Sequence, residues 1–175
     1  MSKQAFEMMM LVLLMAAAMS PLRAAAEAEK KETVTNLHFY FHDILSGKNP
    51  TAVRVVEPVD TYKSTTLFGV VMMADDPLTE TPDPNSKLVG RAQGLYTSAC
   101  QQELGLLMSM SFSFTDGSSI SILGKNSAMN PVREMPVVGG TGKFRLARGY
   151  ALAHTHWLNP ATGDAIVAYN VTVIQ

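Results

Sequence analysis

The sequence predicts an all-β protein, built either as a barrel or as a sandwich. Short segments in which apolar and polar residues alternate follow one another along the chain, which is the period-two pattern of strands. Turn signals separate these segments at short intervals, and beyond the first thirty or so residues no convincing helical pattern occurs. Such regular spacing is typical of barrels and sandwiches. A closed barrel would also protect the edges of so many apolar strands.

The first half of the chain yields four predicted strands and one long loop. Residues 37–44 alternate, residues 52–56 are β-branched, and residues 67–73 are apolar throughout. Residues 75–86 are rich in Asp, Pro and Thr, so we expect a loop there. Residues 88–98 alternate again and form the fourth strand.

The second half begins with the clearest strand, residues 106–115, which places Met and Phe on one face and Ser on the other. Asp116-Gly117 follows, the strongest short hairpin signal in the chain. The remaining predicted strands return from this hairpin and lead to the C-terminus. They are residues 118–123, 132–138, 144–156 and 165–174, with a turn at 160–164.

Chain length, composition and net charge limit the classes to which the protein can belong. A chain of 175 residues with 47% hydrophobic residues is enough for one domain, and its net charge of −1 gives no electrostatic case for nucleic acid binding. Lys3, an apolar run and small residues before Ala26 form a secretory signal layout, too short for a membrane span. We therefore expect a signal peptide over 1–26, a flexible leader over 27–36 and a secreted, soluble domain over 37–175.

Four motifs, in order, resemble those of the plant dirigent proteins. They are residues 39–44 (FYFHDI), 75–79 (DDPLT), 90–96 (GRAQGLY) and 131–142 (PVREMPVVGGTG). The likeness is closer to the branch that includes pterocarpan-synthase-like members. It implies an eight-stranded antiparallel β-barrel with a central apolar cavity, assembled as a trimer. It also implies phenolic small molecules as ligands, no cofactor, and a separate laccase or peroxidase as the source of radicals.

Asp43 is the first candidate site residue, because it stands in phase with Phe39 and Phe41 on an apolar strand face. In a dry pocket, desolvation would raise its pKa and make it a useful acid or base. The alternative is a strand-end Asp that caps the turn before Ser46. The dirigent resemblance implies the pocket, where Phe41 would contact the ligand.

The strand 88–98 bears on whether the barrel is hollow. Its Gly90, Ala92 and Gly94 share a face with Tyr96 and Ser98. Small residues leave volume beside them, which an inward face would offer to one small ligand. Alternatively, the glycines allow bending or the close approach of another backbone. The resemblance implies a cavity with Tyr96 on its wall.

Arg133 is in phase with Met135 and Val137, and its guanidinium could neutralise Asp43, bind phenolic oxygens or stabilise a developing anion. An exposed strand Arg is the alternative, and the resemblance implies the pocket. Asn126 stands where many lignan-forming members have an aspartate, and Ser98 where they have a second tyrosine. Because Asn cannot act as an acid, the pocket is expected to differ from theirs.

Two further patterns concern a metal site and a glycan site. His38 and His42 share a strand face, as do His154 and His156, but no third ligand is evident and we predict no metal. Asn170 begins a valid glycosylation sequon, with its side chain expected on the outer face.

Three functions follow from the resemblance. In the first, the barrel orients monolignol-type phenoxy radicals, such as those of coniferyl alcohol, so that a separate oxidase yields optically active lignans. In the second, the barrel is itself a lyase that expels water from an isoflavanol-like substrate through a quinone methide, with Asp43 and Arg133 as the acting groups. Asn126 and Ser98 favour this branch. In the third, it is a phenolic-binding defence or cell-wall protein without turnover.

Overall fold

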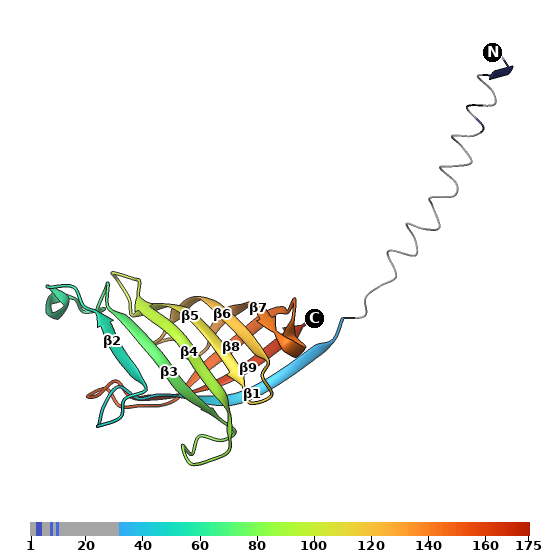
Figure 1. The fold of residues 1–175 in the computed structure, drawn as a ribbon. Coiled ribbons are helices and arrows are strands. Elements are labelled where there is room, and N and C mark those ends of the chain that lie inside the picture. The colour runs from blue at the N-terminus through green and yellow to red at the C-terminus, as the bar shows by residue number, and fades with distance from the viewer. Residues whose placement is uncertain (1–2, 5–7, 9, 11–31) are drawn as a thin grey trace. The chain divides into compact units, whose positions relative to one another are not determined.

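Strands and turns make up nearly all of the C-terminal part of the computed structural model, which describes residues 3–4, 8, 10 and 32–175 (Figure 1). Two one-turn 3-10 helices, η1 (Thr61–Lys63) and η2 (Gly142–Phe144), interrupt the strands. Residues 32–175 hold nine strands: β1 (Val34–Asp43), β2 (Ala52–Val56), β3 (Val71–Thr79), β4 (Leu88–Ser98), β5 (Gly105–Phe114), β6 (Ser119–Ser127), β7 (Arg133–Thr141), β8 (Arg148–Leu158) and β9 (Ala165–Ile174).

The predicted signal peptide lies almost entirely outside the described residues. Within them, no helix has the length and apolar character that crossing a membrane requires.

The strands form one antiparallel sheet that closes on itself. Their order is β1-β9-β8-β7-β6-β5-β4-β3-β2, and β1 also pairs with β3 through Tyr40 opposite Thr79 and Phe41 opposite Leu78. This pairing closes a barrel of eight strands and leaves β2 outside the ring, along β3 (Figure 1). The predicted eight-stranded antiparallel barrel is therefore confirmed, and eight strands leave room for side chains or one small ligand inside.

One predicted loop was wrong. We expected a loop from residue 75 onward, but β3 continues to Thr79. Alternate residues Met72, Ala74, Asp76 and Leu78 are all buried, so the strand's inward face continues through the Asp-Pro segment. Pro77 is tolerated because β1 joins β3 only after it, at Leu78.

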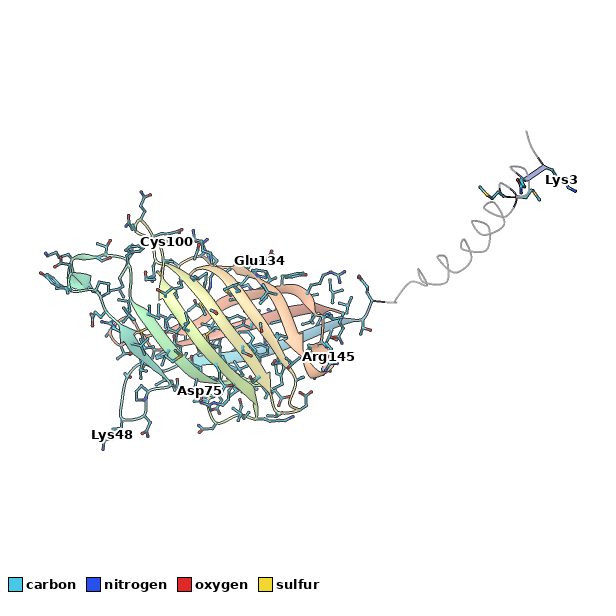
Figure 2. The ribbon with its side chains drawn as sticks, turned by 45° about the horizontal axis from the view of Figure 1, so that its top comes forward. Lys3, Lys48, Asp75, Cys100, Glu134 and Arg145 are labelled. Carbon is cyan, nitrogen blue, oxygen red and sulfur yellow. The ribbon has the colours of Figure 1, made fainter. Side chains whose placement is uncertain are left out.

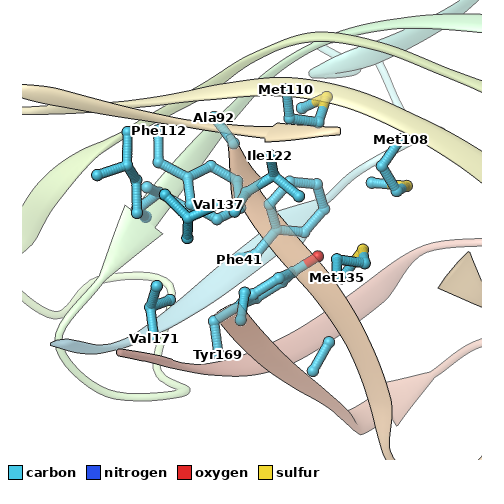
Figure 3. Close-up of a cluster of buried hydrophobic side chains, with 14 of the residues drawn as sticks. Phe41, Ala92, Met108, Met110, Phe112, Ile122, Met135, Val137, Tyr169 and Val171 are labelled. Carbon is cyan, nitrogen blue, oxygen red and sulfur yellow. The ribbon is translucent and has the colours of Figure 1, made fainter. Parts of the chain in front are cut away.

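A packed aromatic core fills one end of the barrel. Phe39 meets Phe112 edge to face at 5.3 Å and stacks on Tyr169 at 5.8 Å. Phe144 of η2 is fully buried against Phe114 and covers the same end. Figure 3 shows this cluster, with the Tyr169 hydroxyl turned toward Phe41 and Met135. Such edge-to-face pairs add to the free energy of burial.

The glycines of β4 let its backbone lie close to that of β5. A Cβ at Gly90 or Gly94 would overlap the backbone carbonyl oxygen of Ser113 or Ser109 on β5, and Gly94 has a φ of +149°. Of the two interpretations left open by the sequence, close backbone approach therefore accounts for these glycines. The cavity is bounded instead by Tyr96 and Ser98 further along β4.

We expect Gly94→Ala to lower the free energy of unfolding by about 2 kcal/mol, because the new Cβ meets β5 and the backbone angle disfavours any side chain. Denaturant unfolding measures this loss. Gly139→Ala is the matched control, since a Cβ there meets nothing within 4 Å. Equal stability of the two variants would refute the explanation.

Candidate functional site

A cavity of about 250 Å³ lies at the end of the barrel away from the aromatic core. It is formed where β1, β4 and β8 end and where β5, β7 and β9 begin. Its wall is mostly apolar, with a few polar groups that converge on it, which is the usual composition of a small-molecule site. All six residues predicted to form the site line this one cavity: Phe41, Asp43, Tyr96, Ser98, Asn126 and Arg133.

Asp43 and Tyr96 form the first polar group of the cavity. The Tyr96 hydroxyl donates a hydrogen bond of 2.8 Å to Asp43 Oδ2, while Asp43 Oδ1 is buried without a partner among the described residues. Burial raises the pKa of Asp43 to about 6, the hydrogen bond from Tyr96 works against this rise, and the nearby Asp164 carboxylate adds to it. Asp43 can therefore hold and donate a proton in mildly acidic solution.

The turn after β1 is capped by a different aspartate. Asp164 Oδ1 accepts hydrogen bonds from the backbone N–H groups of Leu45 (2.8 Å) and Ser46 (3.0 Å), and its Oδ2 accepts one from the Ser46 hydroxyl (2.5 Å). Asp164 thus has the capping role considered for Asp43. The Asp43 side chain is left facing the cavity.

Arg133 supplies the second polar group. Its side chain is buried, and Nη1 donates to Thr155 Oγ1 at 2.6 Å and to the carbonyl oxygens of Ala128 and Asn130 at 3.4 and 3.5 Å. Nε is buried without a partner among the described residues, and burial lowers the pKa of the guanidinium. No ion pair joins Arg133 to Asp43 within residues 32–175, so neutralisation of Asp43 is not its role here. One donor of the guanidinium is therefore left without a partner among the described residues, in a residue that lines the cavity.

Asn126 and Ser98 occupy the wall between these groups. Asn126 is buried and its Oδ1 has no partner among the described residues, so it can accept a hydrogen bond from a ligand. The Ser98 hydroxyl is already used, because it donates to the Thr66 carbonyl oxygen at 2.5 Å. Ser98 therefore anchors the 66–70 segment over the cavity and contributes little to ligand recognition.

Asp76, Thr155 and Tyr169 belong to this region but were not predicted as site residues. Thr155 and Tyr169 line the cavity, and Asp76 is fully buried near Asp43. Burial raises the pKa of Asp76 to about 8, and Asp43 adds to the rise. The alternation of Met72, Ala74, Asp76 and Leu78 could have revealed an inward carboxyl, had it been followed past the first aspartate of the motif.

The histidines serve the structure rather than one site. His42 Nε2 lies 2.6 Å from the Thr79 hydroxyl, where both residues are buried on the face of their strands away from Asp43, whereas His38 donates to Asn170 Oδ1 at 2.8 Å in an exposed position. His156 packs on Tyr40. The described part of the chain contains no group of three or more potential metal ligands. Asn170 is exposed, and its glycosylation stays a prediction.

The sequence profile of the dirigent-like proteins matches residues 34–174. The chain belongs to the dirigent family. Over 153 residues it is 67% identical to dirigent protein 23 of Arabidopsis thaliana, covering 85% of this chain and 82% of the relative. Over 149 residues it is 52% identical to pterocarpan synthase 1 of Glycine max, covering 82% and 80%.

Solved dirigent structures share the barrel. The pterocarpan synthase dirigent protein GePTS1 superposes with a TM-score of 0.79 at 50% identity, covering 84% of this chain and 87% of that one. A second, PsPTS1, gives 0.76 at 49% identity, covering 82% and 96%. The relatives therefore include both dirigent proteins and pterocarpan synthases.

We expect Tyr96→Phe to have a modest effect, about 1 kcal/mol in substrate binding, because the hydroxyl can no longer accept a hydrogen bond from the substrate. The Tyr96 hydroxyl also donates a hydrogen bond to Asp43 that holds the pKa of Asp43 down, so its removal moves the pH at which Asp43 ionises upward. Substrate affinity and the pH dependence of the rate measure the two effects. An unchanged affinity together with an unchanged pH profile would contradict this role.

Proposed function

We propose that this dirigent barrel eliminates water from a phenol-bearing alcohol through a quinone methide, as a lyase of the pterocarpan synthase type. The observation that carries the proposal is Asp43, a largely buried carboxyl that can keep its proton near pH 6 and faces a mostly apolar cavity. A general acid works best when its pKa lies near the working pH. The 52% identity to a pterocarpan synthase supports the same reaction class.

The reaction balances with the groups of this cavity. The alcohol oxygen takes the proton of Asp43 and leaves as water, while a conjugated phenol in the same molecule gives its proton to solvent. The products are a neutral quinone methide and water, and Asp43 regains its proton from solvent. Arg133 Nε, buried and without a protein partner among the described residues, can donate to the phenolic oxygen while it carries negative charge. A second phenol of the substrate can then add to the quinone methide carbon.

The size and polarity of the cavity favour one bound ligand molecule. Its volume of about 250 Å³ is at or below the lower end of the range of small-molecule sites, roughly 300 to 1,000 Å³. One polycyclic phenol suits such a space better than two separate radicals do. Asn126 in place of a second acid also leaves Asp43 as the carboxyl that lines the cavity.

Stereoselective coupling of phenoxy radicals is the second candidate. The 67% identity to a dirigent protein favours it, and a cavity that fixes the orientation of phenols would suffice, with oxidation supplied by a laccase or peroxidase. Secretion to the apoplast and assembly as a homotrimer go with either function and remain predictions from the sequence.

Oxidant dependence separates the two candidates. The purified protein is incubated with an isoflavanol or, separately, with coniferyl alcohol, each with and without added laccase, and the products are resolved by chiral chromatography. We expect the isoflavanol to lose water without laccase, faster than in buffer. If the protein changes only the enantiomeric excess of the laccase-dependent product, the elimination proposal is wrong and coupling replaces it.

A further inference from the structure

We propose that Asp43 and Asp76 act as a carboxyl pair that shares one proton, so that the acid in the cavity is one member of a dyad. The inference rests on the proposed function for its catalytic meaning. The pair itself follows from strand register, burial and the lack of partners, independently of any substrate.

The register of the barrel closure puts the two carboxyls opposite each other. β1 and β3 pair antiparallel through Tyr40 and Thr79, and through Phe41 and Leu78. Continued by two residues, this register brings Asp43 opposite Asp76. Directly opposite residues of antiparallel strands point to the same face, here the interior. The ladder stops just before this point because β3 changes partner there, with the Asp75 N–H bound to the Thr51 carbonyl oxygen.

Asp76 is buried without compensation. Its exposed fraction is 0%, and neither carboxyl oxygen has a hydrogen-bond partner among the described residues. The Thr51 hydroxyl lies close enough to lower its pKa slightly, but it accepts from the Ile44 N–H at 3.2 Å and donates to the His42 carbonyl oxygen at 3.4 Å. A carboxylate in such a place is costly, and a proton removes the cost.

The charged groups around the pair do not neutralise it. Asp75 of β3 and Arg91 of β4 pair with each other on the outside of the barrel, where Figure 2 shows Asp75. Arg91 therefore weakly favours ionisation of Asp76, whereas Asp75 opposes it. From the interior, Tyr96 donates to Asp43, and the Asp164 carboxylate faces Asp43 from the turn before β9.

Tyr169 and His42 are further titratable neighbours of the pair. Tyr169 is buried, and its burial together with the charges of Asp43 and Asp76 raises its pKa. His42 lies between Asp43 and the closure residues on β1, on the opposite face of the strand, and burial lowers its pKa, which favours the neutral imidazole. Two carboxyls of like charge that face each other without a cation cannot both ionise easily, so one proton stays on the pair.

A proton shared by Asp43 and Asp76 changes the pH range in which Asp43 can act as an acid. As the pH rises, the pair loses its first proton near the pKa of Asp43, about 6, and its second near that of Asp76, about 8. Between these values each molecule holds one proton, distributed over both carboxyls. Part of the population then keeps Asp43 protonated at a pH where an isolated Asp43 would be ionised.

The test is a carboxyl titration of the full protein by NMR with ¹³C-labelled aspartate, which needs no substrate. We expect the Asp43 signal, assigned with Asp43→Asn, to move in two steps in the wild type and in one step in Asp76→Asn. Asp75→Asn is the matched control and should keep both steps, because that neighbour lies outside. One step in the wild type, or loss of the second step in Asp75→Asn, overturns the pair.

A second variant and a rate measurement complete this test. If Asp76→Asn does not fold, Asp43→Asn serves instead, and the Asp76 signal must then titrate at a lower pH than in the wild type. For turnover, the wild type should keep part of its rate between about pH 6 and 8, while Asp76→Asn loses close to tenfold per pH unit. A two-step titration in a protein without elimination activity would refute the proposed function and leave the pair intact.

Discussion

Asp43→Asn should abolish most of the elimination activity, with a fall in kcat/KM of at least about 100-fold, while the barrel still folds. A positioned general acid contributes roughly 10² to 10⁴ in rate, and an amide cannot donate this proton. The side chain keeps its size and can still accept the hydrogen bond from Tyr96. If radical coupling is the function instead, the same variant should lose product selectivity, seen as a lower enantiomeric excess.

The matched control is Asp75→Asn, which removes an aspartate of β3 that pairs with Arg91 on the outside. Its rate should stay within about twofold of the wild type, since surface ion pairs contribute little. Steady-state kinetics near pH 5.5 and circular dichroism of both variants give the comparison. Should Asp43→Asn turn over substrate at the wild-type rate, the acid must be sought elsewhere in the cavity.

The course of the strands could be predicted because alternation is a local signal. The pattern of β5 and the Asp116-Gly117 turn determine a hairpin without reference to the rest of the chain. The closure could not be predicted in this way, because the pairing of β1 with β3 joins Phe41 to Leu78 across a segment that contains β2 and η1. A barrel and a sandwich have the same local pattern, so the resemblance to dirigent proteins was needed to choose.

The candidate site, too, could be predicted only in part from the sequence. Phase along each strand places Asp43, Tyr96 and Arg133 on inward faces, and the structure brings all three to one cavity. The phase of residues along one strand cannot identify a partner on a distant strand. Thr155 on β8 accepts the hydrogen bond of Arg133, and the closure of β1 on β3 brings Asp76 near enough to Asp43 for the Asp43 charge to raise the pKa of Asp76.

The free energy of unfolding should respond to pH through Asp76. Its pKa is about 8 in the fold and 3.8 in the unfolded chain, so between these values the folded state holds a proton that the unfolded state has released. The contribution of Asp76 to the free energy of unfolding is therefore largest below about pH 4. It is lost as the pH rises through about 8. We expect the difference in the free energy of unfolding between Asp76→Asn and wild type to shift by about 4 kcal/mol in favour of the variant from pH 5 to pH 9.

Comparing the variant with the wild type cancels the titrations that are independent of Asp76, such as that of His42. His42 acts in the opposite sense, because its pKa is lowered in the fold and its contribution to stability rises as the pH approaches 6.5. Asp116→Asn is a suitable control: hydrogen bonds from Lys143 and Ser118 lower the pKa of Asp116, so its titration lies below this range. Its stability difference should stay constant from pH 5 to 9 in urea unfolding. A constant difference for Asp76→Asn as well would mean that Asp76 ionises normally, despite its burial and its lack of partners.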